Sequence, residues 1–152
     1  MDKVDKQMES RVWQRVRSRE TPEQAPPQRD NLKPWILAAQ ENATACRNLS
    51  LQLIGKQWES LRRLEQENLR LIQCLKGIAR LRGEDIKLTP LMRPSDQPRR
   101  CLEKCLNRQR TLWKQMQLRQ EDPEFGMVFS SLRRRNEDLC AILAELVGKM
   151  ET

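Results

Sequence analysis

Residues 64–84 read LEQENLRLIQCLKGIARLRGE, and the spacing of their apolar residues indicates the fold class. Its apolar residues recur at alternating steps of three and four, the spacing that puts side chains on one face of an α-helix. Gly83 follows the last of them, and a glycine is typical of a helix C-terminus. We therefore expect one long helix from about residue 57 to residue 83. Its inward positions are Leu61, Leu64, Asn68, Leu71, Leu75 and Ile78.

Three further segments have a helical period of apolar residues, and they cover about residues 32–54, 99–121 and 123–149. Gly55 ends the first of them, and Pro123 suits the first turn of the last. Residues 83–98 contain three prolines and form the one long connection. The chain is therefore predicted to be all-α, with a four-helix bundle of two helical hairpins over residues 35–150. A crossover between the hairpins is expected, and an up-down-up-down order is the alternative.

These three segments also have expected inward positions. In chain order they are Trp35, Ala39, Ala43, Cys46, Leu49 and Leu53, then Leu102, Leu106, Gln109, Leu112, Trp113 and Met116, then Val128, Phe129, Leu132, Leu139, Leu143 and Leu146.

The first 34 residues are expected to stand apart from the bundle. Residues 1–19 have the pattern of a short amphipathic helix, and residues 20–34 contain four prolines and form a semi-extended linker. The apolar residues of this N-terminal helix are Val4, Met8, Val12 and Val16. We expect it to bind a protein partner or a second copy of the chain.

The composition suits a helical protein of the cytoplasm. Two phenylalanines and no tyrosine argue against a β-sandwich, and no run reaches the roughly 18 apolar residues of a membrane span. Without a secretion signal, the five cysteines should be reduced thiols. Core packing is their expected role, with a zinc or redox site as the alternative. They are Cys46, Cys74, Cys101, Cys105 and Cys140.

Four stretches carry a resemblance to a known family. They are ILAAQENATACRNLS, RLEQENLRLIQCLKGIARLRGE, NRQRTLWKQM and EDPEFGMVFSSLRRRNEDLCAILAELVG, and the resemblance they carry covers about residues 32–149. There the chain resembles the rubrerythrin-like branch of the ferritin-like superfamily. The resemblance implies a ferritin-like bundle in which two helices each give a glutamate and the other two each give Glu-x-x-His to a pair of iron ions.

Only three of those six ligand positions would keep a ligand. Glu41 stands at the first lone glutamate, and Gln109 replaces the second. Glu67 and Glu137 begin the two Glu-x-x-His pairs; their remaining positions hold Arg70 and Cys140, and the chain has no histidine. The resemblance therefore implies a degenerate site, and we expect no metal or other cofactor there.

Arg70 decides how this site is interpreted. A guanidinium has no lone pair to give a metal, and its permanent charge opposes a cation. We expect it to lie in the middle of the bundle as a counter-ion to Glu41, Glu67 or Glu137. The alternative is an unrelated bundle in which Arg70 and Glu137 are ordinary surface charges.

The sequence predicts a binding or scaffold protein and not an enzyme. No catalytic residues are expected, because a chain without histidine has no Ser-His or Cys-His pair and its five glycines form no phosphate loop. One alternative is a rubrerythrin-like protein that handles iron or peroxide with Glu41, Glu67 and Glu137. A second is a basic module that binds nucleic acid, since the net charge is +8 and Arg133 to Arg135 form a basic run.

Overall fold

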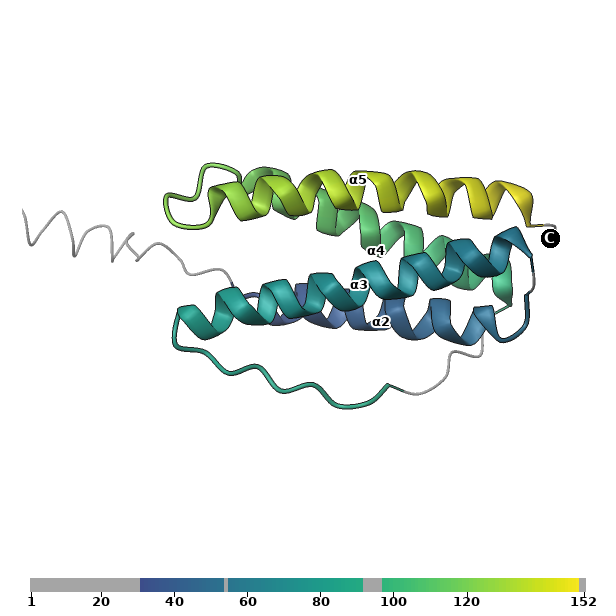
Figure 1. Ribbon diagram of the computed structural model, residues 1–152, viewed down its shortest axis with the longest axis horizontal. Helices are drawn as coiled ribbons and strands as arrows, with labels where there is room; N and C mark the ends of the chain where they lie inside the picture. Colours follow the sequence, from purple (N-terminus) through teal and green to yellow (C-terminus); the bar gives the residue numbers. More distant parts are fainter. Residues whose placement is uncertain (1–30, 54, 92–96, 151–152) are drawn as a thin grey trace, which may run out of the picture. The chain divides into compact units, whose positions relative to one another are not determined.

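The computed structural model describes residues 31–53, 55–91 and 97–150, and all regular structure in this part of the chain is helical. The helices, labelled as in Figure 1, are α2 (Lys33–Ser50), α3 (Lys56–Leu81), α4 (Pro98–Leu118) and α5 (Gly126–Lys149). The predicted all-α four-helix bundle is confirmed. The N-terminal helix predicted at residues 1–19 lies outside the described residues, as does most of the linker.

The helices pack as two hairpins. α2 packs along α3 and α4 along α5, while α2 also contacts α4 and α3 contacts α5. The N-terminal halves of α2 and α5 share one core cluster with the C-terminal halves of α3 and α4. α3 and α4 therefore run in the same direction, at diagonally opposite corners of the bundle.

Two parallel, consecutive helices require a connection that returns along the whole bundle. Sixteen residues separate Leu81 from Pro98, and an extended chain of that length reaches about 50 Å, more than the roughly 30 Å of α4. In Figure 1 the described part of this connection runs beside α2. There Gln40 donates a hydrogen bond to the carbonyl of Thr89 (2.8 Å), and Leu88 packs against the core. The bundle thus has the crossover and not the up-down-up-down order.

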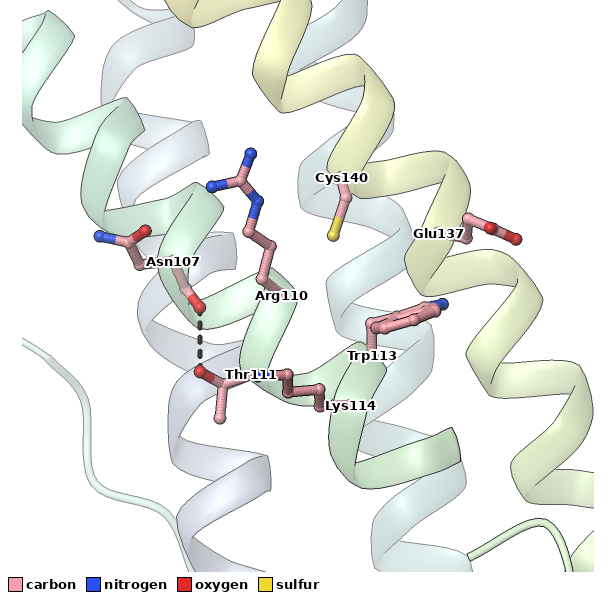
Figure 2. Close-up of a pocket in the computed structure, with 7 residues that line it drawn as sticks. All are labelled: Asn107, Arg110, Thr111, Trp113, Lys114, Glu137 and Cys140. Carbon is pink, nitrogen blue, oxygen red and sulfur yellow. Dashed lines mark hydrogen bonds between the residues drawn. The ribbon is translucent and has the colours of Figure 1, made fainter. Parts of the chain in front are cut away.

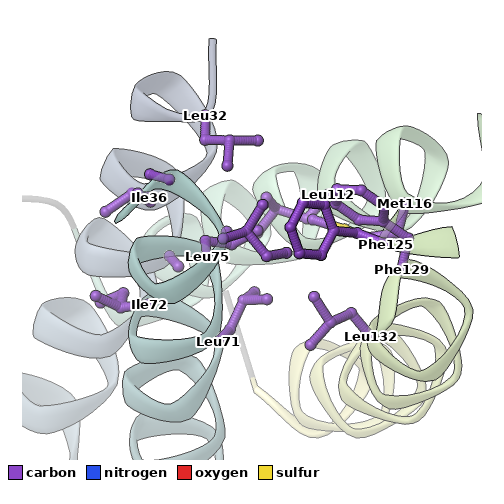
Figure 3. Packing of buried hydrophobic residues seen from close by; sticks show 13 residues of the cluster. Leu32, Ile36, Leu71, Ile72, Leu75, Leu112, Met116, Phe125, Phe129 and Leu132 are labelled. Atoms are coloured by element: carbon purple, nitrogen blue, oxygen red, sulfur yellow. The ribbon is translucent and has the colours of Figure 1, made fainter. Parts of the chain in front are cut away.

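The core consists of two apolar clusters, one toward each end of the bundle. Figure 3 shows the first, in which Phe129 of α5 lies against Leu112 and Met116 of α4. The second cluster includes Leu61, Leu102 and Leu143 among its buried members. Most inward positions expected from the sequence are buried, and four are only partly so: Trp35, Leu53, Trp113 and Val128.

The corner between α4 and α5 differs from its prediction. Pro123 does not enter the helix, because the Asp122 carboxylate accepts hydrogen bonds from the backbone N–H groups of Glu124 and Phe125, both at 2.8 Å. These bonds hold a separate turn, and α5 begins only at Gly126. A Cβ at Gly126 would collide with the carbonyl oxygen of Gln120, so the tight corner requires glycine.

Candidate functional site

Four buried amide side chains form a polar layer between the two apolar clusters. Each helix supplies one of them, and we call this set the amide layer: Asn42, Asn68, Gln109 and Asn136. On α3 the layer is flanked by Leu64 and Leu71, which belong to different clusters. Such a layer needs internal partners, since an unpaired amide in an apolar core costs several kcal/mol.

Gln109 is the hub of the amide layer. Its Oε1 accepts from the Nδ2 atoms of Asn42 (2.9 Å) and Asn68 (3.1 Å). Its Nε2 donates to the Oδ1 atoms of Asn136 (2.6 Å) and Asn68 (3.3 Å). The three asparagines also donate to backbone carbonyls, so every amide of the layer is hydrogen-bonded.

Arg108 hydrogen-bonds to the amide layer at its edge, where α2 meets α4. Its Nε donates to Oδ1 of Asn42 (2.7 Å), and its Nη1 lies 3.4 Å from Oε2 of Glu41. Its Nη2 lies 3.6 Å from the sulfur of Cys105. One arginine thus satisfies the last acceptor of Asn42 and joins the buried layer to a surface carboxylate.

The predicted position of Arg70 in the middle of the bundle is wrong, although one of its predicted carboxylate partners, Glu67, does pair with it. The Arg70 side chain is 66% exposed and pairs on the surface of α3 with Glu67, one turn earlier (2.9 Å). Glu41 and Glu137 also lie at the surface, with 48% and 63% of their side chains exposed. The reason is helical register. Asn68 and the leucines form the buried stripe of α3, and Glu67 and Arg70 lie to one side of it.

We expect Arg70→Ala to change the free energy of unfolding by less than about 0.5 kcal/mol, because exposed ion pairs one turn apart contribute little. Urea denaturation of both proteins measures the difference. Arg63→Ala, on the same helix and also exposed, is the matched control. If Arg70→Ala alone lowered the free energy of unfolding by more than about 2 kcal/mol, Arg70 would act as a buried counter-ion after all.

The sequence identified one of the four layer residues as a site position. Gln109 is such a residue, and the other three lie next to predicted ones: Asn42 beside Glu41, Asn68 beside Glu67, and Asn136 beside Glu137. Asn68 was expected to face inward, but as part of an apolar seam. The signal that could have found the layer is an Asn or Gln on the apolar stripe of every helix.

Three thiols meet in the second apolar cluster. Cys46 on α2 and Cys101 and Cys105 on α4 are all buried. The Cys101 thiol lowers the pKa of Cys105, but the Cys46 thiol and burial outweigh it and raise this pKa to about 12. Among the described residues, no group of three or more Cys, Asp or Glu side chains is placed to hold a metal ion. A protonated, buried Cys105 is a poor nucleophile and a poor ligand.

A hollow of about 630 Å³ runs along the outside of the α4–α5 hairpin, and we call it the α4–α5 groove. Figure 2 shows Trp113 and Cys140 between the two helices, with Arg110 and Lys114 on α4 and Glu137 on α5. Burial raises the pKa of Cys140 to about 11, although Arg110 lowers it. Cys140, predicted at a ligand position, therefore lies in this groove as a neutral thiol at physiological pH.

The sequence matches no family model, and neither a curated protein nor a solved structure matches it. In the part of the chain that the structure describes, no helix is long and apolar enough to span a membrane.

Proposed function

We propose that this chain is a non-enzymatic, ferritin-like bundle that acts as a binding or scaffold protein, with no metal at its centre. The observation that carries the proposal is the amide layer. Gln109 uses both its oxygen and its nitrogen on neighbouring amides. Polar groups that already satisfy one another are not free to bind a metal or a substrate, so this layer serves the fold.

Two features support the ferritin-like part of the proposal. The bundle has a single crossover between its hairpins, which is the connectivity of ferritin-like folds. Its one buried polar layer is also at mid-bundle, at or one residue from the positions where the resemblance puts metal ligands. On this proposal, hydrogen bonds between amides do the work that metal coordination does in the related proteins.

The geometry gives less support to the iron-binding alternative. That alternative needs Glu41, Glu67 and Glu137 around one ion. Each of these carboxylates has an arginine of its own near the surface, namely Arg108, Arg70 and Arg133 in that order. Gathering the three would break these pairs and turn the exposed side chains of Glu41 and Glu137 inward, at a cost in charge burial.

Iron content tests the proposal. Protein from iron-supplemented medium, reconstituted with ferrous iron without oxygen, should carry less than about 0.1 iron per chain by elemental analysis. A Glu41→Ala/Glu137→Ala variant is the matched control and should give the same value. About one iron per chain in the unaltered protein, lost in that variant, would establish the alternative and end the proposal.

A further inference from the structure

The α4–α5 groove is a surface depression with both cationic and apolar walls. From it we infer that the partner is a protein segment that is acidic on one side and apolar on the other. This inference rests on the proposed function, because it names the partner of a binding protein. It takes the groove as the binding site and a short amphipathic stretch as the occupant.

The charge of α4 is the first argument. Its 21 residues include six Lys or Arg and a single Glu. Arg99 and Arg108 lie within 4 Å of carboxylates on Glu103 and Glu41. Arg110 and Lys114 are exposed on the groove wall, and within the described residues neither forms an ion pair. Two cations one turn apart would meet carboxylates spaced one turn apart on a helical occupant.

The groove floor is the second argument. Trp113 turns an indole ring into the groove, with the neutral Cys140 thiol above it in Figure 2. The indole Nε1 is buried and has no hydrogen-bond acceptor. Buried N–H groups are nearly always paired. An occupant would supply the acceptor from a carbonyl or carboxylate and place an apolar side chain against the ring.

Other occupants fit the groove less well. A second copy of a chain with a net charge of +8 would be repelled. A nucleic acid would bring phosphates toward Glu137, which lies on the α5 wall of the groove. The protein segment can avoid Glu137 by turning its apolar side to α5. Its acidic side then faces Arg110 and Lys114.

Fluorescence anisotropy with a labelled, helical peptide of Glu and Leu tests the inference, with the full chain as titrant. Arg110→Glu/Lys114→Glu should weaken binding by about tenfold or more, as expected when a pair of ionic contacts becomes repulsive. Arg134→Glu/Arg135→Glu makes the same charge change at exposed positions of α5 and should weaken it by no more than about threefold. Trp113→Phe keeps a ring but removes the N–H, and an intermediate loss is expected.

Three results would overturn the inference. One is an equal loss in both charge-reversed variants, which means that only net charge matters. The second is no binding of the peptide at about 0.1 mM protein, because the affinity would then be weaker than we expect of a specific docking site. The third is tighter binding of a labelled single-stranded DNA that depends on Arg110 and Lys114. Each concerns the groove alone, whereas iron content judges the proposed function, so the two can fail separately.

Discussion

Gln109→Met is expected to lower the free energy of unfolding by about 3–5 kcal/mol, although methionine has nearly the same shape. The substitution removes four hydrogen bonds at once. It leaves Asn42, Asn68 and Asn136 buried with missing partners, and each such group costs about 1–3 kcal/mol. Urea denaturation followed by circular dichroism measures the loss.

A second variant separates the hydrogen bonds from the packing. Replacing the whole layer at once, Asn42→Leu/Asn68→Leu/Gln109→Met/Asn136→Leu, leaves no amide unpaired. Its stability should return to within about 1 kcal/mol of the original protein or exceed it, as when buried ion pairs are replaced by apolar residues. If Gln109→Met alone cost less than about 1 kcal/mol, the layer would contribute little to stability and would not serve the fold as proposed.

The fourfold apolar variant also tests what the amide layer contributes beyond stability. Polar residues at buried positions fix register in helical assemblies, because a slipped pairing leaves them unpaired. Here one amide per helix must come to the same level for Gln109 to reach its partners. We expect the all-apolar bundle to broaden its amide NMR signals or to form mixed oligomers, while the original protein gives one set of sharp signals.

The fold could be predicted because its determinants are local. The alternating steps of three and four from Leu61 to Ile78 define α3, and the single long connection defines the pairing of the hairpins. The helix ends are predicted less accurately. The turn held by Asp122 makes α5 begin at Gly126 and not at Pro123. Such a turn depends on a side chain that hydrogen-bonds to the backbone, and the spacing of apolar residues gives no information about that bond.

The site was harder to predict because one residue of register separates a surface from a core. Adjacent helical positions differ by about 100° in direction. The predicted ligand positions Glu41, Glu67 and Glu137 lie outside the buried stripe to which each neighbouring asparagine belongs. A charged residue is rarely buried unless paired, whereas an asparagine beside it on the apolar stripe has its hydrogen bonds available for a core network.

Stability should fall as the pH rises above about 9, and Cys105 should account for much of the fall. The pKa of this thiol is raised from 9.0 to about 12 in the folded protein, because Cys46 and burial outweigh the opposing effects of Cys101 and Arg108. Above pH 9 the unfolded chain releases a proton that the folded chain still holds. The unfolded state then binds fewer protons, so the free energy of unfolding decreases with pH until the folded thiol also titrates.

The expected size follows from the same pKa. Between pH 8 and pH 11 the Cys105 contribution falls by about 2.5 kcal/mol, at about 1.4 kcal/mol for each pH unit above 9. Lysines and other thiols also titrate in this range, so the test compares slopes. Cys105→Ala leaves a small cavity whose cost does not depend on pH, and it should flatten the pH dependence by this amount. Cys74→Ala, which removes a half-buried thiol of α3 outside the three-thiol contact, is the control. Parallel curves for Cys105→Ala and the original protein would mean that Cys105 ionises as readily in the folded chain as in the unfolded one, and that the three-thiol contact in the core is looser than the structure has it.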